Sequence, residues 1–126
     1  MKFDYSRSYY PPIPVIEISL ISVAESLRVG PMPALVDTGA DGTVAPVALL
    51  RQIQAPVTVE MMVRGQWGES RPVLLYLVDV QIGDVVLPGV EVVGDDVGDE
   101  LILGRDVLNR LNMRLNGPQE MVELRL

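Results

Sequence analysis

The 126-residue chain contains no cysteine and no histidine. Without cysteine it has no disulfide, no thiol nucleophile and no cysteine-bound zinc or iron–sulfur site. Without histidine it lacks the Ser-His-Asp and Cys-His triads and the imidazole zinc sites. If the chain is an enzyme, its general acid and base must therefore be Asp, Glu, Lys or Tyr.

Long apolar runs and clustered positive charge are also missing. No segment approaches the ~20 apolar residues of a membrane span, and the polar start Met1–Arg7 is unlike a signal peptide. We therefore expect a soluble, cytoplasmic protein that does not bind a membrane. The 17 acidic and 10 basic side chains give a net charge of −7. Because the arginines are scattered, this acidity argues against a nucleic-acid partner.

The composition is that of a folded domain, with 48% apolar and 21% charged residues. The length suits one domain. Residues 1–12 end in Pro11-Pro12 and are predicted to form an extended arm. The domain is predicted to cover residues 13–126, with a C-terminal strand extension at 117–126 that could fold back on residues 112–116.

Short strands separated by turn residues are predicted for most of the chain. The predicted strands are Ile13–Ile21, Ala34–Val36, Val57–Val63, Val73–Ile82, Val85–Val93, Leu101–Leu103 and Met121–Leu126. Gly30, Pro31 and Pro33 predict turns within residues 22–33. One short helix is predicted over residues 105–111, and residues 47–53 fit either a helical turn or a short strand. The pattern predicts an all-β, barrel-like domain with one short C-terminal helix.

The sharpest local feature is Asp37-Thr38-Gly39-Ala40, directly after the apolar run Ala34–Val36. A carboxylate would lie at a strand end, and Gly39 would let another backbone pass close by. An Asx-type turn between two strands is the plain alternative. A calcium loop is excluded, because the positions that would need ligands hold Gly39 and Ala48. No metal site is predicted.

Two segments make the sequence recognisable. Residues 33–44, PALVDTGADGTV, resemble the active-site segment of retroviral-type aspartic proteases, the retropepsins. Residues 101–108, LILGRDVL, resemble the second signature of that family. The resemblance runs from about Ile13 to Asn116 and implies a retropepsin-like closed β domain with a flap hairpin.

The resemblance implies an aspartic endopeptidase with Asp37 as the catalytic residue. Such enzymes use two carboxylates that share one proton, so that one acts as base on a water and the other as acid. No second Asp-Thr-Gly or Asp-Ser-Gly occurs in the chain. The dyad therefore requires a homodimer with Asp37 on each side of a two-fold axis. A polypeptide is the implied substrate, and no cofactor is required.

The same resemblance assigns roles around Asp37. Thr38, Gly39 and Ala40 match the active-site loop, where the threonine braces the two loops and the glycine carbonyl contacts the bound peptide. Asp41 and Arg105 match an intrachain ion pair behind the site; two solvated surface charges are the alternative. Asp106 is expected to cap the short helix.

The hairpin from Val57 to Ile82 matches the flap that closes over the peptide. Its tip residues are Gly65, Gln66, Trp67 and Gly68. Val44 and Ile102 match positions that line the substrate pocket. Ordinary packing is the alternative for Trp67, Val44 and Ile102 alike.

Two other functions stay open on the sequence alone. One is a non-catalytic retropepsin-like module that binds peptide or mediates dimerisation. The other is a β-barrel that binds a small ligand, for which the sequence has no dedicated signal. The absence of cleavage, together with a monomer at all concentrations, would favour the non-catalytic module over the protease.

Overall fold

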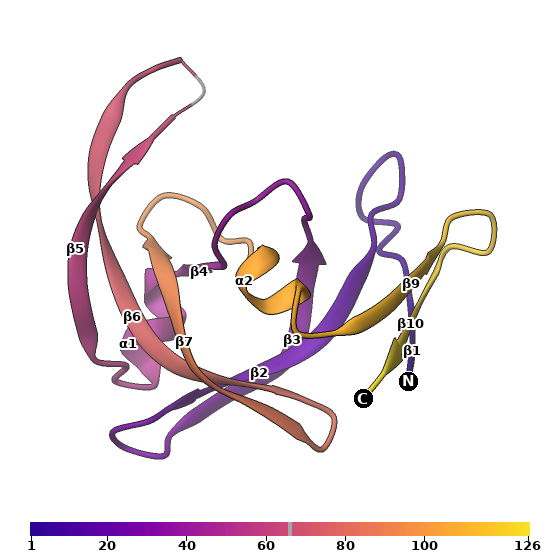
Figure 1. Ribbon diagram of the computed structural model, residues 1–126, viewed down its shortest axis with the longest axis horizontal. Coiled ribbons are helices and arrows are strands. Elements are labelled where there is room, and N and C mark those ends of the chain that lie inside the picture. The colour runs from indigo at the N-terminus through magenta and orange to yellow at the C-terminus, as the bar shows by residue number, and fades with distance from the viewer. Residues whose placement is uncertain (66) are drawn as a thin grey trace.

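The computed structural model describes residues 1–65 and 67–126, which form mainly β-strands (Figure 1). The strands are β1 (Lys2–Asp4), β2 (Val15–Ser22), β3 (Arg28–Val36), β4 (Val44–Pro46), β5 (Val57–Arg64), β6 (Ser70–Ile82), β7 (Val85–Asp95), β8 (Ile102–Leu103), β9 (Asn112–Asn116) and β10 (Met121–Arg125); the helices are α1 (Val47–Gln52) and α2 (Arg105–Leu108).

The larger sheet closes on itself. Its strand order is β2-β3-β8-β4-β7-β6-β5, and β6 also pairs with β2. The strands from β2 to β6 in this order therefore form a closed barrel, which confirms the predicted barrel-like β fold. β5 pairs with β6 alone and continues with it into a long hairpin that projects from the barrel (Figure 1).

The barrel core follows from alternation along its strands. Ile16, Ile18 and Leu20 of β2 are fully or almost fully buried, and so are Val78 and Val80 of β6. Successive side chains of a strand point to opposite faces, so these positions share the inward face. Burial of such β-branched and leucine side chains stabilises the fold by about 1.5–3 kcal/mol each.

Strand β3 is longer than the sequence predicted, and the turns expected within residues 22–33 are wrong for residues 28–33. Gly30, Pro31 and Pro33 were expected to form turns, but they lie inside this nine-residue strand. The Leu35 N–H donates to the Leu101 carbonyl (2.8 Å), so Pro33, two residues earlier, faces the same side. On that side β3 pairs with β8 only at residues 35 and 36. Pro33 has no neighbouring strand there, so its missing N–H costs the sheet no hydrogen bond.

The two helices are short. Residues 47–52 form the helix α1, so the helical turn, and not the short strand, is the correct alternative for this segment. α2 ends at Leu108 instead of Leu111, because the Leu111 N–H bonds the Leu108 carbonyl in a turn (3.1 Å). Neither helix of the described residues has the length and hydrophobicity to cross a membrane.

A second, three-stranded sheet has the order β1-β10-β9. β9 and β10 form an antiparallel hairpin, so the C-terminal strand does fold back on residues 112–116. Residues 2–4 of the expected N-terminal arm pair with β10 as β1, and both termini lie at this sheet (Figure 1). Val122 and Leu124 are buried in the core that this sheet shares with the barrel.

Candidate active site

The two segments that carry the sequence resemblance lie side by side. β3 and β8 pair in parallel, with Leu35 opposite Ile102 and Val36 opposite Leu103. The Asp37 N–H then donates to the Leu103 carbonyl (3.1 Å). Asp37 is thus positioned at the end of β3, where the loop from residue 37 to 43 begins.

The Asp37 carboxylate is exposed and folded back on its own loop. Its Oδ1 accepts the Gly39 N–H (2.9 Å), and the Asp37 carbonyl accepts the Ala40 N–H (3.2 Å). A Cβ on residue 39 would lie 3.2 Å from that same Oδ1, so glycine leaves room for the carboxylate. Thr38 and Gly39 are also exposed on this loop, while Ala40 is half-buried.

Arg105 of α2 holds the loop of residues 37–43 in place through several hydrogen bonds. Its backbone N–H donates to the Ala40 carbonyl (2.9 Å), and its Nη1 donates to the Thr38 carbonyl (2.7 Å). Its Nη2 forms an ion pair with Asp41 Oδ1. The Asp41 side chain is 94% exposed, so this pair contributes at most about 1 kcal/mol to stability. Its effect is to hold the loop in one geometry, for which the planar fork of arginine is suited.

A polar network that the sequence did not reveal lies beneath the loop. Thr43 is fully buried, and its hydroxyl donates to Asp106 Oδ1 (2.8 Å) and accepts the Gly104 N–H (3.1 Å). The Thr43 N–H donates to Asp106 Oδ2 (3.2 Å). Asp106 is not the N-cap of α2, which is Gly104, although its Oδ1 also accepts the Val107 N–H (2.9 Å) in the first turn of the helix. Asp106 thus fixes the active-site segment against α2.

Gly104 permits this close packing. A Cβ at this position would lie 2.5 Å from the backbone carbon and oxygen of Gly42. Only glycine lets the two segments approach so closely, because the atoms that it would meet belong to the backbone.

The expected pocket residues are neighbours. Val44 pairs with Ile102 across β4 and β8, and both side chains are half-buried. Val44 also pairs with Val93 of β7. These positions form an apolar strip next to the loop that begins at Asp37.

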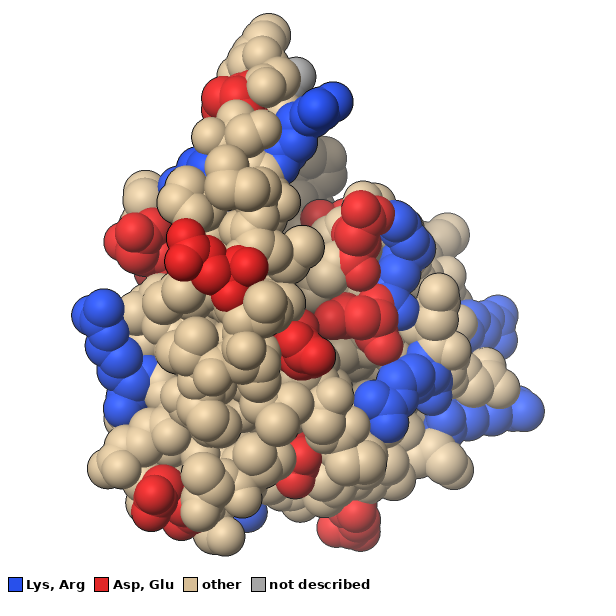
Figure 2. Space-filling view, turned by 60° about the vertical axis from the view of Figure 1, so that its left-hand side comes forward, with Lys and Arg blue, Asp and Glu red and all other residues tan. Residues whose placement is uncertain are grey.

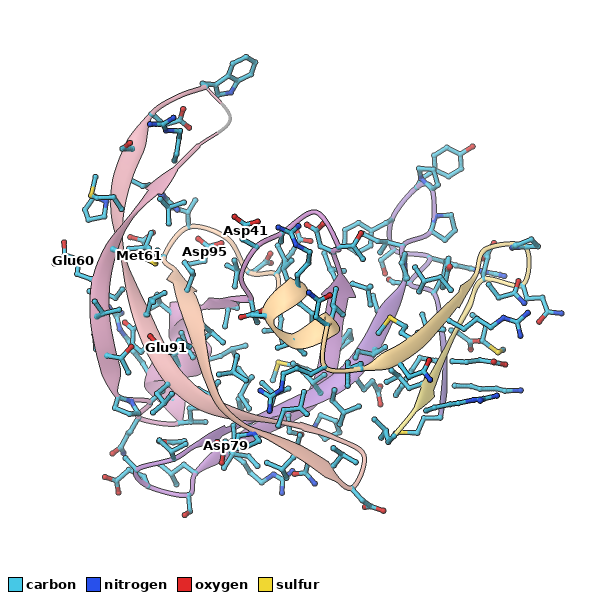
Figure 3. All side chains as sticks on the ribbon, viewed as in Figure 1. Asp41, Glu60, Met61, Asp79, Glu91 and Asp95 are labelled. Carbon is cyan, nitrogen blue, oxygen red and sulfur yellow. The ribbon has the colours of Figure 1, made fainter. Side chains whose placement is uncertain are left out.

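The β5–β6 hairpin projects beyond the barrel and leaves a hollow at its side (Figure 2). Gly65, Trp67 and Gly68 lie at its end, and Gln66 lies outside the described residues. Trp67 is 85% exposed. Met61 points from β5 toward the concave side of the hairpin, where Asp41 and Asp95 lie, and Glu60 points away (Figure 3).

The loop after β7 is held by Asp95. Its Oδ1 accepts the N–H groups of Val97 (2.9 Å) and Gly98 (3.0 Å). These two hydrogen bonds lower the pKa of Asp95 below the ordinary aspartate value, because they stabilise the ionised form. The bond from Gly98 has the larger effect. Asp95 pairs with Pro46 of β4, so this loop flanks the strip that contains Val44.

The N-terminal loop also contacts this end of the fold. The Tyr9 hydroxyl donates to Glu100 Oε2 (2.8 Å). This hydrogen bond to a carboxylate raises the pKa of Tyr9. Among residues 1–65 and 67–126, no group of three carboxylates lies close enough together to hold a metal ion.

Comparison with known families agrees with this arrangement. The family model "gag-polyprotein putative aspartyl protease" matches residues 28–110, which include both Asp37 and Arg105. The chain belongs to this aspartyl protease family. Its matched part contains β3, the β5–β6 hairpin, β8 and α2, and thus every element that forms the site.

Solved structures of this protease fold are similar over nearly the whole chain. A retropepsin-like aspartic protease from Rickettsia conorii matches with a TM-score of 0.63 and 14% identity, covering 97% of this chain and 86% of that one. EIAV protease in complex with the inhibitor HBY-793 matches with a TM-score of 0.59 and 18% identity, covering 86% and 93%.

A third match is the retroviral protease-like domain of Ddi1 from Leishmania major, with a TM-score of 0.52, 18% identity and 89% of each chain covered. At such identities these structures establish the fold and nothing finer. No curated protein sequence matches the chain.

Proposed function

We propose that the chain is an aspartic endopeptidase whose catalytic dyad consists of Asp37 from two copies in a homodimer. The observation that carries this proposal is the exposed carboxylate of Asp37 on a loop that Arg105 and the Thr43 network hold in place. The described chain provides one such carboxylate, and this chemistry requires two.

Two carboxylates within hydrogen-bond reach repel each other when both are ionised, so this chemistry uses a pair that shares one proton. The ionised member removes a proton from a water, and this water attacks the scissile carbonyl carbon. The protonated member donates its proton to the carbonyl oxygen, which gives a tetrahedral diol. Neither histidine nor cysteine is needed, and the chain has neither.

The surroundings of Asp37 fit a peptide substrate. Val44 and Ile102 provide an apolar strip beside the loop. The concave face of the β5–β6 hairpin adds Met61, which is 43% exposed and thus free to contact a ligand. We propose that the hairpin closes over the peptide as a flap and excludes water from the reacting bond.

The test is cleavage of a peptide library between pH 4 and 7 by the wild type and by Asp37→Asn. Asp84→Asn serves as the matched control, because Asp84 is an exposed acid in the turn between β6 and β7. Asp37→Asn should lower kcat/KM by more than about a thousandfold, and Asp84→Asn should leave it unchanged. Equal cleavage by Asp37→Asn would refute the catalytic assignment. A folded wild type that cleaves no peptide would favour the non-catalytic module.

A further inference from the structure

The Glu100 pocket is a hollow of about 270 Å³ beside β3, and its lining includes Tyr9, Leu35, Asp99 and Glu100. We propose that this pocket receives a lysine or arginine side chain of the peptide next to the scissile bond, and that Glu100 selects it by charge. The inference rests on the proposed function, because it names the class of peptide that the same site cleaves. Small-ligand pockets usually measure about 300–1,000 Å³, so the Glu100 pocket suits a single side chain.

The Glu100 pocket lies on the face of β3 that also presents Asp37. The Leu35 N–H donates to the Leu101 carbonyl (2.8 Å). The Asp37 N–H donates to the Leu103 carbonyl (3.1 Å), so the parallel pairing with β8 continues to Asp37. Residues two apart in a strand project from the same face, about 7 Å from each other. The pocket at Leu35 therefore begins one such step from Asp37, within reach of a side chain beside the scissile bond.

The walls of the pocket suit the stem of a long basic side chain. Val15 of β2 pairs with Leu35, and both residues line the pocket. Leu35 is half-buried, whereas Ala34 and Val36 on either side of it are buried in the core. Leu35 therefore faces away from the core and leaves apolar surface open to a ligand. Lysine and arginine lay their methylene stems along such surface and keep the charged group at its edge.

Glu100 provides the charge of the pocket. The Tyr9 hydroxyl donates to its Oε2 (2.8 Å) and orients the carboxylate, while Oε1 accepts no hydrogen bond from residues 1–65 and 67–126. Within the same described residues, no lysine or arginine forms a salt bridge with Glu100. Asp99 also lines the pocket and adds a second negative charge. The pocket therefore offers a carboxylate oxygen to a cationic group of the peptide.

Tyr9 belongs to a loop whose two ends are tied together. Residues 5–14 connect β1 to β2. Within them, the Ser6 N–H donates to the Ile13 carbonyl (2.8 Å), and the Ile13 N–H donates to the Ser6 carbonyl (3.1 Å). This closed loop holds the Tyr9 hydroxyl at Glu100. Tyr9 is thus a positioning residue, which acts on the peptide through the Glu100 carboxylate.

A symmetric dimer contains the Glu100 pocket twice. The two-fold axis that relates the two Asp37 carboxylates also relates the two pockets, so one lies on each side of the scissile bond. Basic residues that flank this bond would each meet a carboxylate. Acidic residues at the same positions would face Glu100 and Asp99, and the repulsion between like charges would disfavour them. The preferred substrate is therefore a peptide with lysine or arginine beside the cleaved bond.

Two peptides that differ only in the residues flanking the scissile bond, lysine in one and glutamate in the other, test this specificity. The wild type should cleave the lysine peptide with a kcat/KM at least about tenfold higher, and Glu100→Gln should lower that ratio at least about fivefold. Glu100→Lys should reverse the preference. Glu25→Gln, at an exposed position in the turn between β2 and β3, should keep the wild-type ratio.

Because each ratio is measured within one variant, a smaller folded fraction of that variant does not alter it. A wild type without preference for the lysine peptide, or a Glu100→Gln variant with the wild-type ratio, would overturn the proposal.

The positioning role of Tyr9 has its own test. Tyr9→Phe removes the hydroxyl that orients Glu100, so the ratio of kcat/KM for the lysine and glutamate peptides should fall at least about twofold. Tyr10→Phe is the matched control, because Tyr10 is 99% exposed, and it should keep the wild-type ratio. An unchanged ratio in Tyr9→Phe would refute this role, since a merely structural tyrosine would not affect the choice between the two peptides.

Binding of the same two peptides separates the specificity from the proposed function. Fluorescence anisotropy gives the Kd of each labelled peptide for Asp37→Asn, with and without Glu100→Gln. Tighter binding of the lysine peptide that depends on Glu100, without any cleavage by the wild type, would reject the proposed function alone. Asp37-dependent cleavage with equal kcat/KM for both peptides would reject the role of the Glu100 pocket alone.

Discussion

Thr43 is a fully buried polar residue at the point where the Asp37 loop meets α2. Replacement by valine keeps the shape but leaves Asp106 Oδ1 and the Gly104 N–H without the hydroxyl between them. We expect Thr43→Val to lower the free energy of unfolding by about 1–3 kcal/mol. Urea denaturation measures this.

Thr58 provides the control for that variant. Its hydroxyl also bonds a carboxylate, Glu91 Oε2 (3.0 Å), but on the exposed strand β5. Thr58→Val should change stability by less than about 0.5 kcal/mol. Equal losses in the two variants would show that the buried network adds nothing beyond a surface hydrogen bond.

The close packing at Gly104 leads to a second prediction for a single residue. Its added Cβ would meet the Gly42 backbone at 2.5 Å, whereas a Cβ at Gly117 would meet no atom within 4 Å. Gly104→Ala should therefore destabilise the fold by about 1–3 kcal/mol through steric overlap, and Gly117→Ala by less than about 0.5 kcal/mol. Thermal unfolding of the pair compares them, and a tolerated Gly104→Ala would disprove the tight contact.

The sequence could predict the residues of the site that belong to local motifs, and only those. Asp37 and Arg105 each lie in a short segment with a recognisable pattern. Thr43 and Asp106 are 63 positions apart, and nothing in the pattern around either of them indicates the other. Asp106 was expected to cap α2, and its carboxylate bonds both the Val107 N–H of the helix and the distant Thr43, a contact that local spacing does not indicate.

At the scale of elements, alternation of apolar residues predicted most of the barrel strands, while only the last three residues of β3, Ala34–Val36, were predicted as a strand. Gly30, Pro31 and Pro33 are turn residues by local preference. Their place in a strand depends on which edge of β3 faces a neighbour, which is a property of the assembled sheet. The fold-back of the C-terminal strand on residues 112–116 was expected from the sequence, and the β9–β10 hairpin confirms it.

The loop after β7 provides a pH-dependent prediction at the scale of an element. The pKa of Asp95 is lowered in the folded state, so this carboxylate stabilises the fold above the pKa of the unfolded chain. The stabilisation is lost as the pH falls through the folded-state pKa. The difference in unfolding free energy between wild type and Asp95→Asn should therefore be positive at pH 6 and become smaller toward pH 3.

Urea titrations of both proteins at several pH values measure that difference, with Asp96→Asn as the control from the same loop. A difference that stays constant, or grows in acid, would show that the bonds to the Val97 and Gly98 N–H groups do not favour the ionised form of Asp95.

At the scale of the whole molecule, the structure has the features that the proposed symmetric enzyme needs from each of its two copies. The chain positions a single exposed Asp37 on a braced loop, an apolar strip beside it, and a hairpin that projects from the barrel with a hollow at its side (Figure 2). The family and fold are established, and the pairing of two copies is the proposal that joins these features into one site.

Subunit mixing tests this central claim most directly. Asp37→Asn is titrated into wild-type protein at a fixed wild-type concentration, and peptide cleavage is measured after the subunits have exchanged. If the dyad is shared, each mixed dimer holds one aspartate and is inactive, so cleavage should fall steadily toward zero as the variant is added in excess. Cleavage that stays constant at every ratio would contradict the account, because each wild-type chain would then contain a complete site of its own.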